Sequence, residues 1–396
     1  MPTRRRTRRA GILGLSLALA IASVLPMMAQ AQGQCVATAS GLRLPVGSTM
    51  TDGGNLLVAE SGDGGAESGR ISIIDRNGNR RTLIDGMPSG PSDVGDPSGP
   101  SGLLMQGRSL FVTIGEGDVA VMGPRPGTAF ENPAGPSSPI FSSVLELFFT
   151  GRAEARTTGF TMTRRDQDAL AKGKLVQLRD SRGNFMFIRM VTDLPNFTPS
   201  PLPDVPGNIH ATNPFAIAGF GLSFYVNDGG RNSTWRVNRF TGAASEFASY
   251  PDIPNPLFGR VGGPVIQAVP TGINTVGRQL LVSLFRGAPF ATGVSTVEIL
   301  DPFTGAHSPL ITGLTTGIDT AVERYRGRDN LLVLEMAGSG PFFAGPGTLL
   351  RFPNFGGTPE TVADCLVSPT SMSLDRWTDT MYVTQQDGSV VRVPLH

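Results

Sequence analysis

The sequence is poor in the residues that build metal centres and catalytic relays. Only two of its 396 residues are cysteine and three are histidine. Zinc sites draw on several cysteine and histidine side chains at short spacing, whereas Cys35 and Cys365 stand near opposite ends of the chain. This scarcity argues against a zinc-binding module, a histidine-rich metal site and a histidine relay. No nucleophile elbow or phosphate-binding loop is present either.

Lysine is almost absent, since Lys172 and Lys174 are the only two. Without residues 1–31, which hold five arginines and no acids, the chain carries 28 basic and 32 acidic residues, a net charge of about −4. So mild a charge, with no run of one sign, argues against nucleic acid or an anionic membrane as a partner.

Long apolar runs are confined to residues 12–28, which follow a cluster of arginines. Ala29, Gln30 and Ala31 then form a small-x-small cleavage pattern. This order predicts a secretory signal peptide over residues 1–31, with Sec and Tat export both open. Pro26 and the modest length argue against a spanning helix. We therefore expect an exported protein, periplasmic or extracellular, with no membrane insertion after signal removal.

Glycine and short apolar strands are abundant, and one strand pattern recurs six times. The central valines of the copies are Val58, Val112, Val226, Val282, Val333 and Val383. They lie 54, 114, 56, 51 and 50 residues apart. A period near 50 in a glycine-rich, strand-rich chain is typical of propeller blades. The sequence predicts an all-β fold in which residues 32–396 form a single six-bladed β-propeller.

The last repeat contains only three strands, and the missing outermost strand is found at the other end of the chain. We expect residues 35–42 to pair with residues 389–394 and so close the ring, which removes exposed sheet edges. A disulfide between Cys35 and Cys365 would then stabilise the fold by roughly 4–5 kcal/mol in the chain-entropy model. The alternative is two separate thiols too far apart to bridge.

The spacing of 114 residues between Val112 and Val226 is about twice the usual period. We interpret residues 117–173 as an insertion within blade two that leaves from the end of the second strand and covers one mouth of the ring. The outer hairpin of this blade is then expected at residues 175–178 and 185–191. The alternative is a hidden seventh blade.

In a four-stranded antiparallel blade, the first strand starts and the second strand ends at the same rim. The residues expected to form a ligand-binding channel rim are Glu60, Glu116, Asn213, Asp228, Arg286, Asp319, Glu335 and Gln386. Carboxylate and amide oxygens suit Ca²⁺ or another divalent cation. The candidate metal ligands are Glu60, Asn213, Asp228 and Asp319. Crowded carboxylates could also supply a general acid or base, whereas a competing interpretation is that strand ends are polar because they meet solvent.

Several segments together resemble a known group of exported propellers. They are residues 57–62, 99–117, 213–229, 269–282, 318–335, 345–349 and 368–383. Over these segments the chain resembles the ScyD/ScyE family and, more distantly, NHL and gluconolactonase-like propellers. The resemblance implies the fold and export, with no settled reaction and no catalytic residues to transfer. Asp52 and Gly53 form the one clear Asp-Gly turn between first and second strands, which marks a divergent member.

The sequence favours binding of a small molecule or a partner protein at the channel mouth by a monomeric protein. One alternative is a metal-dependent lactonase, hydrolase or lyase that uses the acidic rim. Another is a scaffold without catalysis.

Overall fold

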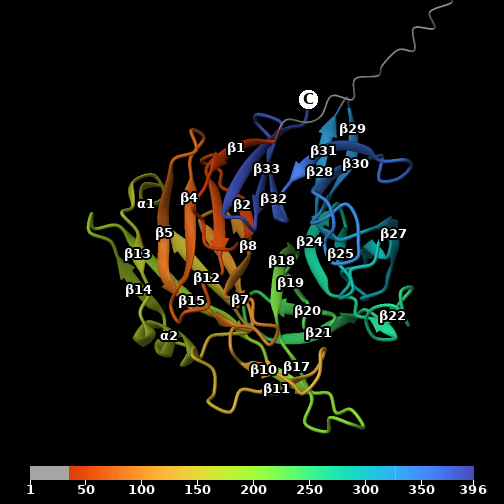
Figure 1. Ribbon diagram of the computed structural model, residues 1–396. Coiled ribbons are helices and arrows are strands. Elements are labelled where there is room, and N and C mark those ends of the chain that lie inside the picture. Colours follow the sequence, from red (N-terminus) through yellow and green to blue (C-terminus); the bar gives the residue numbers. More distant parts are fainter. Residues whose placement is uncertain (1–34, 326) are drawn as a thin grey trace, which may run out of the picture. The chain divides into compact units, whose positions relative to one another are not determined.

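The computed structural model describes residues 35–325 and 327–396. The chain divides into two units, residues 1–31 and 32–396, and the predicted signal peptide lies outside the described residues. In the second unit, six sheets of four or five strands surround a central channel as a six-bladed β-propeller (Figure 1). The predicted fold class is confirmed.

Blades one, three, four and five follow the expected order from the innermost to the outermost strand. Blade one consists of β2 (Pro45–Met50), β3 (Leu56–Glu60), β4 (Gly69–Ile74) and β5 (Arg80–Met87), with β13 (Phe160–Thr161) added parallel to β5. Blade three consists of β18 (Pro214–Phe220), β19 (Ser223–Asp228), β20 (Ser233–Asn238) and β21 (Ala244–Ser249). Blade four consists of β24 (Pro270–Val276), β25 (Gln279–Leu284), β26 (Ser295–Leu300) and β27 (His307–Leu314). Blade five consists of β28 (Gly317–Tyr325), β29 (Arg328–Glu335), β30 (Gly347–Pro353) and β31 (Glu360–Leu366).

Blade six is completed by the N-terminal strand, as predicted. Its strands are β32 (Pro369–Asp375), β33 (Thr380–Gln385), β34 (Ser389–Pro394) and β1 (Val36–Ala39). β1 runs antiparallel to β34, with Val36 opposite Arg392, and the red β1 lies beside the blue strands of the last blade in Figure 1. The predicted disulfide between Cys35 and Cys365 is present, with Cα atoms 6.2 Å apart. A strand ladder and a covalent bond thus both close the ring.

Blade two differs from the expected strand assignment. From the channel outward its strands are β8 (Pro100–Gln106), β9 (Ser109–Ile114), β12 (Ser143–Phe149), β15 (Phe185–Asp193) and β14 (Val176–Arg179). β12 lies inside the segment expected to be one insertion, and it takes the third position that we assigned to residues 175–178. It pairs with β9, which ends at Ile114, on one side and with β15, which begins at Phe185, on the other, so long connections separate it from both neighbours. A search for adjacent strands joined by short turns therefore misses it.

Residues 117–173 accordingly contain two additions that flank β12. The first carries β10 (Ala120–Met122) and β11 (Ala129–Glu131). The second carries α1 (Gly151–Arg156) and α2 (Arg164–Ala171). Glu154 of α1 is buried, accepts hydrogen bonds from Thr51 at 2.6 Å and Asn55 at 2.8 Å, and pairs with Arg108 of blade two at 2.8 Å. The second addition therefore braces blades one and two against each other.

We call the face of the ring where the first strand of each blade begins the upper face. Short hairpins lie on this face. Besides β10 and β11, they are formed by β6 (Gly90–Pro91) with β7 (Pro97–Ser98), β16 (Phe197–Pro199) with β17 (Ile209–Ala211), and β22 (Ile253–Pro254) with β23 (Val265–Ile266). Three of these hairpins lie in the connections from one blade to the next. No helix in the described part of the chain is both long and apolar enough to span a membrane.

A β-bulge occurs near the start of every inner strand. In each blade the register shifts just after the first residue of the strand. The second residues of these strands are Val46, Ser101, Phe215, Thr271, Ile318 and Thr370. Bulges re-aim side chains, and all six of these side chains line one cavity at the centre of the ring.

Candidate functional site: a cavity at the upper mouth of the channel

The upper mouth of the channel holds a cavity of about 700 Å³, which we call the mouth cavity. Its floor consists of the six bulge residues. Four of them also line a second cavity of about 430 Å³ in the channel below: Val46, Phe215, Ile318 and Thr370. These four side chains therefore separate the mouth cavity from the lower channel.

Hydrogen bonds between neighbouring blades hold this floor in place. Apolar and hydroxyl residues alternate around the ring, and each hydroxyl donates to a carbonyl of the next blade. Ser101 Oγ donates to the Phe215 carbonyl at 2.7 Å. Thr271 Oγ1 donates to the Ile318 carbonyl at 2.8 Å, and Thr370 closes the circle at the Pro45 carbonyl, 2.9 Å away. The floor is thus built before any ligand enters.

One side of the mouth cavity is aromatic. Phe285 and Phe290 follow the second strand of blade four, and Phe343 follows the second strand of blade five. The rings of Phe290 and Phe343 stack with their centroids 4.1 Å apart, and Phe285 lies 5.7 Å from Phe290. Met336 and Val269 extend this apolar wall.

The other side of the mouth cavity is polar and acidic. Asp93 and Asp96 come from the connection between β6 and β7, Glu116 follows β9, and His210 lies on β17. Burial raises the pKa of Asp93 and lowers that of His210. Among the lining residues that the structure describes, none is arginine or lysine.

Glu116 is the most enclosed of these acids. It is only 4% exposed, and its carboxylate makes no hydrogen bond or ion pair with any described residue. Its backbone N–H donates to the Asn213 side-chain oxygen at 3.4 Å. Burial first, and then the negative charges of Asp93 and Asp228, raise the pKa of Glu116 well above its ordinary value. The side chain is therefore a carboxyl group without a protein partner inside a ligand-sized cavity.

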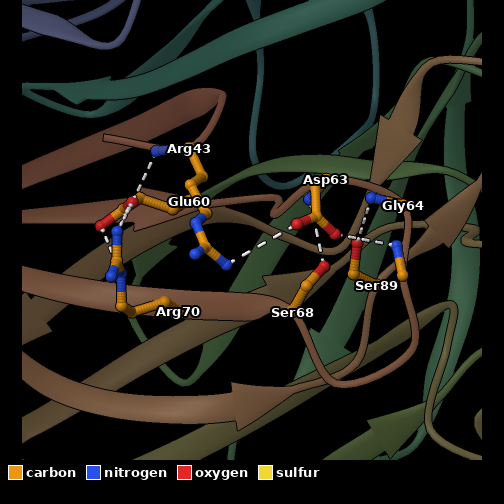
Figure 2. A network of polar contacts seen from close by, with 8 residues as sticks. Arg43, Glu60, Asp63, Gly64, Ser68, Arg70 and Ser89 are labelled. Atoms are coloured by element: carbon orange, nitrogen blue, oxygen red, sulfur yellow. Dashed lines mark hydrogen bonds and ion pairs between the residues drawn. The ribbon is translucent and has the colours of Figure 1, made fainter. Parts of the chain in front are cut away.

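Glu60, expected at the rim, is instead fully buried inside blade one and does not line the mouth cavity. Its carboxylate accepts the Arg43 backbone N–H at 2.7 Å and pairs with Arg70 (Figure 2). It also accepts the Ser72 hydroxyl. Arg43 belongs to the segment that enters the inner strand. The carboxylate therefore fastens the connection between blades onto the end of the second strand, an arrangement that we call the clasp.

Asp228 and Glu335 form the same clasp in blades three and five. Asp228 accepts the Asn213 backbone N–H at 2.9 Å and the Trp235 indole N–H at 2.9 Å, and burial raises its pKa to about 6. Glu335 accepts the Thr315 backbone N–H at 2.7 Å. The equivalent residues in the other blades are Gln385, which accepts the Val367 N–H at 2.7 Å, and the apolar Ile114 and Leu284. The four polar residues at this position are polar because each accepts a hydrogen bond from a backbone N–H of the segment that enters the inner strand.

The remaining predicted rim residues lie in three different places. Asn213 and Gln386 line the mouth cavity together with Glu116. Arg286 is buried away from this cavity and donates to the Pro251 carbonyl at 3.2 Å. Asp319 lies below the floor, where it accepts the Met372 N–H at 3.0 Å and the Thr320 N–H at 2.8 Å, and burial raises its pKa to about 6.

The four candidate metal ligands are not brought together. Glu60 and Asp228 are engaged in clasps, Asn213 lines the mouth cavity, and Asp319 lies below its floor. Across residues 35–325 and 327–396, no group of three or more His, Cys, Asp or Glu side chains is placed to hold a metal ion.

Our sequence reasoning missed Asp93 and the three phenylalanines. Asp93 sits in a Gly-containing turn between blades, and Phe285, Phe290 and Phe343 follow second strands at irregular distances. The position of Phe285 just after a second strand was the one signal available.

Neither a protein-family model nor a curated protein matches the sequence. Among solved structures, a gluconolactonase from Xanthomonas campestris is similar, with 9% identity and a TM-score of 0.49 over 92% of this chain and 90% of that one. A putative oxidoreductase (glucose dehydrogenase) from Thermus thermophilus has 16% identity and a TM-score of 0.48 over 91% and 99%. A PQQ-bound aldose sugar dehydrogenase from Streptomyces coelicolor has 14% identity and a TM-score of 0.46 over 92% and 98%. Likenesses at this level carry no argument about activity.

Proposed function

We propose that this protein binds a small organic molecule in the mouth cavity. The observation that carries the proposal is the cavity itself, about 700 Å³ in volume, with an aromatic wall on one side and hydrogen-bonding groups on the other. Pockets for small ligands in proteins typically have volumes of roughly 300–1,000 Å³ and combine apolar walls with a few placed polar groups. A floor already held by hydrogen bonds between blades also reduces the ordering that binding requires.

We further propose, from the sequence resemblance, that the chain is a divergent ScyD/ScyE member that acts after export. The disulfide between Cys35 and Cys365 supports this location, because such bonds persist in oxidising compartments.

The test is binding of N-phenyl-1-naphthylamine, an uncharged dye that fluoresces in apolar sites. Gly287 lines the mouth cavity, and a Cβ added there would meet its nearest neighbours at an ordinary 3.6 Å. The backbone at Gly287 therefore accepts a side chain, and the indole of Gly287→Trp should occupy the cavity and abolish dye binding. Gly263→Trp is the matched control, because Gly263 is exposed with no atom within 4 Å of an added Cβ. Equal dye binding by both variants would refute the proposal.

A second candidate function is hydrolysis or elimination with Glu116 as the proton donor or acceptor. A carboxyl group with a raised pKa in a ligand-sized cavity favours it. Turnover of δ-gluconolactone, lost in Glu116→Gln, would support it, and equal rates in both proteins would exclude it for this substrate class. Metal analysis of the dialysed protein tests whether Ca²⁺ or another divalent cation takes part.

A further inference from the structure

Resting on the proposed function, we infer that the ligand of the mouth cavity is an organic cation, a protonated amine or quaternary ammonium group carried on an aromatic or aliphatic body. Charge, an enclosed carboxylate and the placement of the aromatic wall each point to this class.

The charges of the residues that line the cavity favour a positive ligand. Three carboxyl side chains line it, those of Asp93, Asp96 and Glu116, whereas none of the described lining residues is arginine or lysine. Arg231 lies near His210 and Asp228 but does not line the cavity, and its guanidinium pairs with Glu246 at 2.9 Å. A concave site lined by one sign of charge concentrates ligands of the opposite sign.

The enclosed carboxylate of Glu116 is a second argument, separate from the negative charge of the cavity lining. Its side chain is more than nine-tenths buried, lines the cavity and has no partner among the described residues. A buried charge without a partner is costly, and the clasp carboxylates of Glu60, Asp228 and Glu335 all have partners. A cationic ligand would supply Glu116 with this partner, because an ammonium group provides both charge and N–H donors.

The position of Glu116 follows from the loss of a clasp in blade two. Ile114 occupies the site that Glu60 takes in blade one, so the first acid after β9 comes two residues later. There it reaches the mouth cavity instead of the interior of the blade.

The aromatic wall lies across the ring from this acid. Glu116 comes from blade two and Phe343 from blade five, which is the opposite member of a ring of six. A ligand that spans the mouth places its cationic group against Glu116 and Asp93 and its body against Phe290 and Phe343.

Binding of such a ligand releases a proton, because the cation favours the ionised form of Glu116. The charged groups around this carboxyl are Asp93 and Asp228, with His210 beside Asp93 and Arg231 beside Asp228. Affinity for a permanently charged cation should therefore rise with pH, whereas affinity for an uncharged analogue should stay nearly constant.

The experiment compares three probes with the same body: 4-phenylbutylamine, 4-phenylbutan-1-ol and 4-phenylbutyrate. Each is titrated as a competitor of the bound dye at pH 8. We expect the amine to displace the dye at a concentration at least tenfold lower than the alcohol, and the carboxylate to be weakest. An alcohol or carboxylate that competes as well as the amine would overturn the inference while leaving the proposed function intact. If the dye does not bind, the amine is titrated directly by calorimetry, and a lack of binding by the amine as well refutes both the proposed function and the inference.

Two variants of cavity residues and one control test which carboxylates cause the preference for the amine. Glu116→Gln keeps the shape and breaks no hydrogen bond of the carboxylate, so it should fold and lose most of the preference for the amine over the alcohol. Glu131→Gln is the control, because Glu131 is an exposed acid of the first addition in blade two and does not line the cavity. Asp93→Asn should reduce the preference partly. A preference retained in both Glu116→Gln and Asp93→Asn would contradict the inference.

Discussion

The Asp228 carboxylate accepts the backbone N–H of Asn213 at 2.9 Å. The side chain of the same Asn213 lines the mouth cavity and accepts the backbone N–H of Glu116. A clasp inside blade three therefore orients two residues of the cavity. Acids at equivalent-looking strand ends have two separate roles in this propeller, one in fastening blades and one in the cavity, and the roles predict different outcomes of mutation.

Removing a clasp carboxylate should destabilise the fold without changing the ligand site. Glu60→Ala leaves Arg70 without its counter-charge and the Arg43 N–H without its acceptor (Figure 2). Breaking such a buried pair typically costs about 3–5 kcal/mol, which should lower Tm by roughly 5 °C. Dye affinity of the folded variant should equal that of the wild type.

Asp63→Ala is the matched control, because Asp63 pairs with Arg43 at 3.6 Å on the exposed surface. Its loss should change the stability little, because exposed ion pairs are screened by solvent. Calorimetry of both variants checks the prediction, and equal losses of stability would show that Glu60 is not a clasp.

Removing the charge of Glu116 should stabilise the protein, and more so at higher pH. The folded state raises the pKa of Glu116 above its unfolded value. The stability that this group contributes is therefore complete below the unfolded pKa and is lost as pH rises through the folded pKa. Glu116→Gln abolishes this loss, so the variant should match the wild type at pH 4 and exceed its Tm by a few degrees at pH 8.

Calorimetry at a series of pH values measures this difference. Asp319, whose pKa is about 6, titrates in both proteins and cancels in the comparison. Asp93 and Asp228 interact with Glu116, so their change in titration is part of the measured difference. A difference in Tm that does not change with pH would count against an unpartnered Glu116.

The disulfide should contribute strongly to stability. It joins residues 330 positions apart, and closing so long a loop in the unfolded chain contributes about 4–5 kcal/mol in the entropic model. The double variant Cys35→Ser with Cys365→Ser should melt several degrees below the wild type in the absence of reductant. Dithiothreitol should lower the Tm of the wild type and leave the variant unchanged. If dithiothreitol did not change the Tm of the wild type, the disulfide would make no such contribution to stability.

The blades could be predicted because the second strand of each is buried on both faces. All five residues of β3 are buried, as are the last six of β29. In the sequence these two strands therefore appear as continuous apolar runs that end on a glutamate. Ring closure could be predicted because the last repeat contains only three strands and the N-terminal segment provides the missing fourth strand. β12 could not be found in this way, because its partners lie far away in sequence.

The candidate site was less accessible to sequence reasoning. Glu60 and Glu116 both follow a second strand, and an offset of two residues decides whether the side chain points into the blade or into the cavity. The offset is visible in the sequence once the clasp position is known. Asp93 and Phe290 are placed by irregular connections between strands, where no periodic pattern indicates direction.

The third residues of the six inner strands lie just after the floor residues, and we call their level the waist of the channel; these residues are small in five blades and Asp319 in blade five. A Cβ on Gly47 would lie 2.1 Å from the Ser101 carbonyl oxygen, and one on Gly102 would lie 2.6 Å from the Ala216 Cα. Both contacts are with backbone, which moves only if a whole blade moves. Gly47→Ala should therefore lower the free energy of unfolding by more than about 3 kcal/mol or prevent folding.

Gly356→Ala is the matched control, because no atom lies within 4 Å of an added Cβ and the backbone there needs no positive φ. It should leave stability unchanged or raise it by up to about 1 kcal/mol, since alanine restricts the unfolded chain. Yield of folded protein and Tm for the two variants provide the measurement. A Gly47→Ala protein with the Tm of the wild type would mean that the inner strands do not touch at the waist, and the closed floor beneath the mouth cavity would then have no basis.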